Sequence, residues 1–178
     1  MGVWVRWIAA LAALCFVACT QTVERPLLVK TTIREIMDAE VDPAADALWD
    51  SVAFNLTRTS YEEVQPRTAE EWQAVRRHAI TLLEATNLIV MDGRKIATAG
   101  VPLAPGELSP ETLQRKLDAN PAPFIGFAQA LRALSVKAID AIDAKDARRL
   151  FEVGGEIDEA CEACHLVYWY PPDAAPRS

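Results

Sequence analysis

The amino-acid sequence predicts an all-α fold, an antiparallel four-helix bundle with a short extra helix between its second and third long helices. Apolar residues recur at helical spacing in four long segments, and no alternating strand pattern runs for more than a few residues. Proline, glycine and helix-capping residues separate these segments. With 51% hydrophobic and 24% charged residues among 178, the composition is that of one compact domain. Four amphipathic helices bury their apolar faces by packing against one another.

The first helix is expected at about residues 31–54, where Pro43 is predicted to bend or restart it. The second helix begins at a capping box, in which Glu71 follows Thr68 by three residues, and it ends at Gly93. The apolar positions of the first helix at mostly helical spacing are Ile33, Ile36, Met37, Val41, Leu48, Trp49 and Val52.

A short helix is expected to open at Ser109 and Pro110, because proline suits the first turn. The third long helix is predicted over about residues 123–142, and the fourth opens at Asp146 and ends before Pro171. In the fourth helix, Gly154 and Gly155 indicate close helix packing. An up-down-up-down order brings the start of the first and third helices and the end of the second and fourth to one pole.

The bundle is expected to occupy residues 31–170, after an export segment. Residues 1–18 have the pattern of a secretory signal, with an apolar run from Ile8 to Ala18 that is shorter than the ~20 residues of a membrane span. The stretch "FVAC" ending at Cys19 resembles the lipobox of bacterial lipoproteins, which implies acylation of Cys19. The alternative is a soluble periplasmic protein cut near Ala18.

These patterns predict a periplasmic protein held to a membrane by lipid on Cys19, with residues 19–30 as a linker and residues 171–178 as a disordered tail. Thr20 directly after Cys19 favours the outer membrane by the same resemblance. A net charge of −7 and the absence of any basic run of five residues exclude a nucleic-acid-binding footprint.

No enzyme is expected, because no nucleophile lies beside a histidine and no glycine-rich phosphate loop follows a strand. A homodimer is compatible with the apolar stripe on the first two helices, although every bundle helix carries such a stripe.

The chain ends with "EACEACHLVYWYPP", in which Cys161, Cys164 and His165 form a C-x-x-C-H motif. A structural zinc site needs four ligands, and the only further candidate here is His78. A redox dithiol belongs at the start of a helix after a strand, whereas this motif lies in the last turns of a helical pattern. Covalent haem attachment uses all three residues and is favoured, with a zinc-binding or dithiol protein as the remote alternative.

The spacing suits haem chemistry. On a helix, residues at i, i+3 and i+4 share one face, so both sulfurs can form thioethers with the haem vinyl groups while His165 reaches the iron.

A helical exported chain with C-terminal "CEACH" and Tyr168 after it resembles the cytochrome c′ family of class II cytochromes c. The resemblance implies one covalent haem c near the end of the fourth helix, with Cys161 and Cys164 as thioether residues and His165 as proximal ligand. It also implies that a residue of the first helix covers the distal face. Family members often carry a basic residue four positions after the histidine, where this chain has Trp169.

The group on the distal side of the haem iron decides between two functions. Met37 lies at the predicted haem level of the first helix, and Met91 is less well placed. If Met37 binds the iron, the protein is an electron carrier with an unidentified periplasmic redox partner. If it only packs there, the iron is five-coordinate and open to nitric oxide or carbon monoxide. Electron transfer is favoured, with gas binding as the alternative.

Other side chains are expected around the haem. Aromatic residues are predicted to wall the pocket, and three polar residues near the end of the second helix are candidates for the haem propionates. His78 lies too far along the second helix to reach the iron. The aromatic candidates are Phe124, Phe127, Tyr168 and Trp169, and the polar candidates are Thr86, Asn87 and Arg94.

Overall fold

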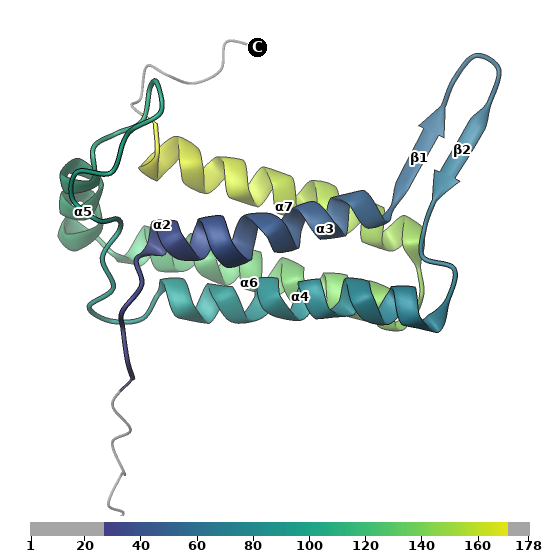
Figure 1. The fold of residues 1–178 in the computed structure, drawn as a ribbon, viewed down its shortest axis with the longest axis horizontal. Coiled ribbons are helices and arrows are strands. Elements are labelled where there is room, and N and C mark those ends of the chain that lie inside the picture. Colours follow the sequence, from purple (N-terminus) through teal and green to yellow (C-terminus); the bar gives the residue numbers. More distant parts are fainter. Residues whose placement is uncertain (1–26, 171–178) are drawn as a thin grey trace, which may run out of the picture.

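The computed structural model describes residues 27–170, and this part of the chain is mostly helical (Figure 1). The predicted signal at residues 1–18, the predicted lipidation site Cys19 and the predicted tail at 171–178 lie outside the described residues. The elements in chain order are α2 (Ile33–Ile36), the π-helix η1 (Met37–Val41), α3 (Asp42–Ser51), β1 (Ala53–Leu56), β2 (Tyr61–Val64), α4 (Ala69–Ile89), α5 (Pro110–Ala119), α6 (Ala122–Asp143) and α7 (Ala147–Tyr168).

The helix starts follow the caps that the sequence predicts. The Thr68 hydroxyl accepts a hydrogen bond from the Glu71 amide at 3.1 Å, and the Glu71 carboxylate accepts one from the Thr68 amide at 3.0 Å. Ser109 caps α5, and Asp146 caps α7 by accepting a hydrogen bond from the Arg149 amide at 2.9 Å. Each cap satisfies a backbone donor that has no partner inside its helix.

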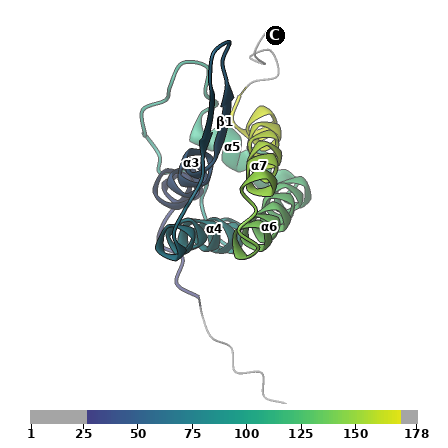
Figure 2. The same ribbon diagram turned by 90° about the vertical axis from the view of Figure 1, so that its right-hand side faces the viewer.

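The long helices lie side by side (Figures 1 and 2). Helix α4 packs on α3 and α6, and α7 packs closely along α6 and less extensively on α3. The short α5 lies at the end of the assembly where α7 terminates (Figure 1). No helix within residues 27–170 is long and apolar enough to cross a membrane. The largest fully buried core side chains are Leu48, Leu82, Ile96, Leu150, Val153 and Ile157.

The first predicted helix is interrupted where the sequence places Pro43. The segment before it is π-helical, and the Asp42 amide donates to the carbonyl of Met37, five residues back. Proline has no amide hydrogen, and its ring crowds the carbonyl four residues earlier, here that of Ala39. A wider turn relieves that crowding, so the predicted bend or restart takes the form of a π-helical turn at Met37–Val41.

The predicted end of the first helix at residue 54 is wrong. Helix α3 ends at Ser51, and Val52 is extended with φ −140° and ψ 130°. Strand β1 then pairs antiparallel with β2 in a hairpin that projects from the end opposite α5 (Figure 1). The Phe54 ring packs edge-on against Phe151 of α7, with 5.3 Å between centroids. This contact between residues far apart in the sequence favours the strand, so the fold is helical with one small sheet added.

Candidate functional site

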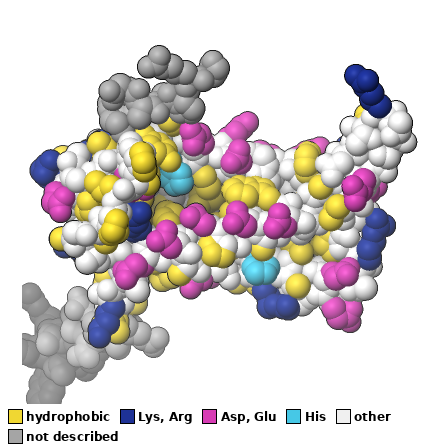
Figure 3. Space-filling view, turned by 45° about the horizontal axis from the view of Figure 1, so that its top comes forward, with side chains coloured by type: hydrophobic (Ala, Val, Ile, Leu, Met, Phe, Trp, Pro, Cys, Tyr) yellow, Lys and Arg dark blue, Asp and Glu magenta, His cyan; other side chains and the backbone are white. Residues whose placement is uncertain are grey.

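The C-x-x-C-H motif lies in the last turns of α7, and its three side chains are partly buried. Cys161, Cys164 and His165 together line one narrow hollow, as expected for residues that share a helix face. Figure 3 shows a histidine beside a depression lined by hydrophobic side chains. The other lining residues come from η1, α3, α4, α6 and α7: Met37, Val41, Asp42, Ile89, Phe124, Phe127, Ala128, Leu131 and Ala160.

Both thiols are partly buried and favour their neutral form. Burial raises the pKa of Cys161 to about 11, and the carboxylates of Asp42 and Asp158 add to this shift. Burial, with a smaller effect of Cys161, raises the pKa of Cys164 to about 12. A reactive dithiol needs a lowered thiol pKa. The environment of these cysteines is therefore unlike that of a redox dithiol.

A zinc site would need further ligands near the motif. Within residues 27–170, no three histidine, cysteine, aspartate or glutamate side chains are grouped as a metal ion requires. His78 is exposed on α4 and does not line the hollow.

His165 lies between two different environments. It lines the apolar hollow and also a neighbouring polar pocket. Met37, the first residue of the π-helical turn, and Asp42, the first residue of α3, line both as well. The structure thus brings Met37 to the level of His165, as the helix lengths predict. The remaining residues of the polar pocket are Arg34, Asp38, Glu107, Trp169 and Tyr170.

A polar cluster joins three distant segments in that pocket. The indole of Trp169 donates to Glu107 at 2.8 Å, and the Arg34 guanidinium lies 3.4 Å from the same carboxylate and 5.4 Å from the centroid of the Trp169 ring. Burial raises the pKa of Glu107, but hydrogen bonds from Ala104 and Trp169 and the charge of Arg34 outweigh it, so the pKa lies below its ordinary value.

Sequence reasoning did not find this cluster, because its members lie far apart along the chain. The one available signal was Trp169 at the position where the resembling family often has a basic residue. Here a cation does line the pocket of His165, and it is Arg34 from α2.

Most of the predicted wall residues gather at the hollow. Phe124 and Phe127 line it, and the buried Tyr168 packs edge-on against both, with centroid distances of 5.5 and 6.2 Å. Trp169 instead belongs to the polar pocket.

The three candidates for propionate binding have other partners. The buried Thr86 hydroxyl donates to the Leu83 carbonyl at 2.7 Å and accepts from Arg132 at 3.1 Å. Asn87 is exposed and donates to the nearby Glu84. Neither lines the hollow.

Arg94 stabilises the end of α4. Its buried guanidinium donates to the carbonyls of Leu88 and Thr31, each at 2.6 Å, and to the sulfur of Met91 at 3.2 Å. Arg94 and Met91 line a different pocket, which shares Ile89 and Phe124 with the hollow but contains neither cysteine.

Comparison with known proteins finds no family model, no curated protein and no solved structure that matches this chain.

Proposed function

We propose that this chain is an exported c-type cytochrome that carries one covalent haem and transfers electrons, in an antiparallel four-helix bundle like that of cytochrome c′. One observation carries the proposal: two neutral thiols and an imidazole line a single apolar hollow at the end of α7. The packing of α3, α4, α6 and α7 side by side supports the bundle.

The residues present fit a haem. Cys161 and Cys164 would form the thioethers, and His165 would hold the iron. Phe124 and Phe127 line the hollow and would exclude water from it. When bound, the haem supplies a reversible one-electron couple. The hollow is narrow, so a haem would fit only if α3 and the π-helical turn before it moved away from α7, and α7 packs less extensively on α3 than on α6.

The test is whether haem stays attached after denaturation. We expect the haem to survive acid-acetone extraction and to show the spectrum of a two-thioether haem in alkaline pyridine. The double variant Cys161→Ala/Cys164→Ala should lose covalent haem, and the control His78→Ala should keep it, because His78 is exposed and outside the hollow. Extractable haem, or a colourless protein that binds zinc stoichiometrically, would contradict the proposal.

Gas binding is the second candidate, and the apolar lining next to Met37 favours it, because such a surface admits a small neutral ligand. If Met37 is an iron ligand, Met37→Ala should change a low-spin spectrum to high-spin and lower the potential. If it only covers the site, the substitution should leave the spin state unchanged and raise the rate of carbon monoxide binding, at a cost of ~2–5 kcal/mol in stability. Met91→Ala is the matched control.

The export hypothesis has its own test. Lipidation predicts that Cys19→Ala releases the protein from the membrane fraction or blocks its maturation, because acyl chains supply most of the membrane affinity. We place the protein in the periplasm, at the outer membrane on the basis of Thr20. Cys19→Ala protein that remains in the membrane fraction after normal processing would exclude the lipid anchor.

A further inference from the structure

A further depression lies between α3 and α7, and its lining residue Asp158 precedes Cys161 by one helical turn. It is an open groove of about 450 Å³, within the range of about 300–1,000 Å³ that is typical of ligand sites. Its apolar lining consists of Leu48, Trp49 and Val52 from α3 and Phe151, Gly154 and Gly155 from α7. The Phe151 side chain is 48% exposed, so a large aromatic group at this groove remains in contact with water.

The two glycines shape the groove. Trp49 donates from its indole to the carbonyl of Gly154 at 2.9 Å, and a Cβ on Gly154 would come within 3.2 Å of the indole ring. A Cβ on Gly155 would meet nothing within 4 Å, so open space adjoins this part of α7. Because the indole nitrogen already has a partner, the Trp49 side chain offers a ligand only an apolar surface.

Two acidic side chains of α7 line the groove, Glu152, which is paired with Arg149, and Asp158, and further acidic residues lie along α3 and α7 toward the motif. Asp42 and Asp46 lie four residues apart on α3, and Asp158 and Glu162 lie four residues apart on α7. All four are exposed, and none forms an ion pair or side-chain hydrogen bond with another residue of the described part. Figure 3 shows acidic side chains on both sides of a strip of apolar ones.

Within each pair, the two negative charges repel each other. Like charges four residues apart on a helix are destabilising by a few tenths of a kcal/mol. Asp158 is three residues before Cys161, so it lies one turn from the motif on α7. An apolar groove with negative edges complements a positive surface that carries an exposed apolar side chain, and such complementarity steers encounter.

We propose that this groove is the docking site for a redox partner protein whose basic surface presents an apolar side chain. The apolar side chain would enter between Trp49 and Gly155, and lysine or arginine side chains around it would face Asp46 and Asp158. This inference rests on the proposed electron-transfer function, because docking here places the partner beside the motif.

The experiment uses the mature chain and a defined probe, the amidated peptide KKLKKWKK. Binding is measured by amide chemical shifts, with affinity determined at low and at near-physiological salt. We expect shifts at Trp49 and Gly155, weaker binding at higher salt, and no binding of the peptide EELEEWEE. The amide readout works with or without haem, so failure of docking and failure of the haem proposal are distinguished.

Two variants separate groove binding from simple charge attraction. Asp46→Lys/Asp158→Lys should weaken peptide binding about tenfold, whereas Glu84→Lys/Asp140→Lys, which makes the same change in net charge on exposed positions of α4 and α6, should weaken it about twofold or less. Equal losses in the two double variants would overturn the proposal, because they would show that net charge alone drives binding.

Gly155→Leu tests the groove itself. The new side chain enters open space and leucine favours a helix more than glycine, so thermal stability should not fall. Peptide affinity should fall about tenfold, because the groove is filled. Unchanged affinity would overturn the proposal. The proposal would also be overturned if sedimentation showed that the wild-type protein is a dimer and the Gly155→Leu variant a monomer. The occupant of the groove would then be a second copy of the chain.

Discussion

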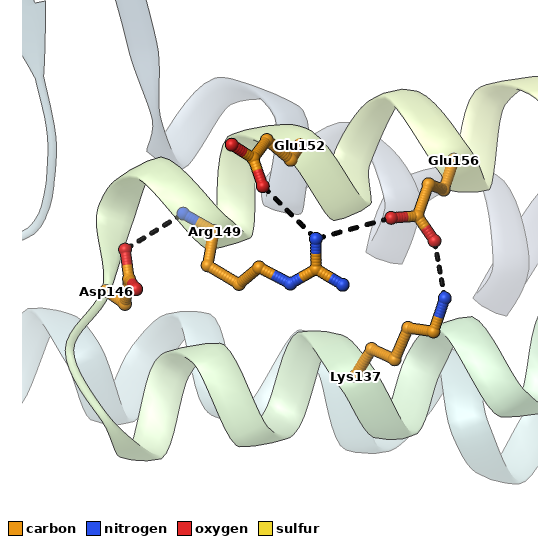
Figure 4. Close-up of polar contacts among 5 residues, drawn as sticks. All are labelled: Lys137, Asp146, Arg149, Glu152 and Glu156. Carbon is orange, nitrogen blue, oxygen red and sulfur yellow. Dashed lines mark hydrogen bonds and ion pairs between the residues drawn. The ribbon is translucent and has the colours of Figure 1, made fainter.

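The two halves of α7 differ in whether their polar side chains have hydrogen-bond and ion-pair partners. In the first half, Asp146 caps the helix, and Arg149 lies 3.1 Å from Glu152 and 3.5 Å from Glu156 (Figure 4). Glu156 also accepts a hydrogen bond from Lys137 of α6 at 2.6 Å. These groups find their partners inside the protein.

The second half lacks such partners. Between residues 158 and 166, no side chain forms a hydrogen bond or ion pair with another residue of the described part. Its acidic residues are exposed, its two thiols are partly buried, and His165 lies at the border of two pockets. The polar groups of the first half are thus paired with neighbours on α6 and α7, whereas those of the second half are available to the cofactor and docking partner proposed above.

The largest difference between the halves should appear in core truncation. Ile157 is fully buried at the middle of α7. Ile157→Ala should lower the free energy of unfolding by ~2–5 kcal/mol, because a cavity replaces the side chain. Leu166→Ala, at a site that is 38% exposed, should cost ~0.5 kcal/mol or less. Urea unfolding measures both values. Similar losses at the two positions would remove the distinction between the halves.

Adjacent glycines should respond in opposite directions. Gly154→Ala places a Cβ against the indole of Trp49 and should cost ~1–3 kcal/mol, because the ring must shift from its hydrogen bond to the Gly154 carbonyl. Gly155→Ala should stabilise by ~0.5–1 kcal/mol, because it reduces the entropy of the unfolded chain in open space. Thermal unfolding checks both signs, and destabilisation by both variants would contradict the geometry of the groove.

The polar cluster of Arg34, Glu107 and Trp169 should make the stability of the protein depend on pH. Because the folded-state pKa of Glu107 lies below its ordinary value of 4.5, ionised Glu107 contributes stability above that pH, and the contribution is lost as pH falls through the lower folded value. Glu107→Gln should therefore destabilise the protein at neutral pH and have little effect in strong acid. Melting temperatures across this pH range test the sign, and a constant difference would exclude an ionic contribution.

The smallest effect is expected at Arg149. Its side chain is 42% exposed, and exposed ion pairs contribute little because water and salt screen them. Arg149→Gln should lower the melting temperature slightly at low salt, and the difference should disappear at high salt. A large loss that persists at high salt would show that the ion-pair network of Figure 4 has a structural role beyond screened charge attraction.

Several features of the fold follow from neighbouring residues and were therefore predictable. The capping box at Thr68 and the caps at Ser109 and Asp146 start helices where the sequence places them, because a cap is a contact across three residues. The π-helical turn before Pro43 follows from the missing amide hydrogen and the crowding by the proline ring. The hairpin was missed because the contact between Phe54 and Phe151 joins two residues that no local pattern relates.

The sequence by itself determined the chemistry of the candidate site, since the spacing of Cys161, Cys164 and His165 places them on one face of any helix that contains them. Only the tertiary structure decided which residues of other helices lie against that face. Packing brings Met37, from a distant part of the chain, to the same hollow as His165. It also places the Trp49 indole against the Gly154 carbonyl, to which it donates a hydrogen bond. The physical reason is that helix geometry is set by hydrogen bonds over three or four residues, whereas these contacts depend on how separate helices bury their apolar faces together.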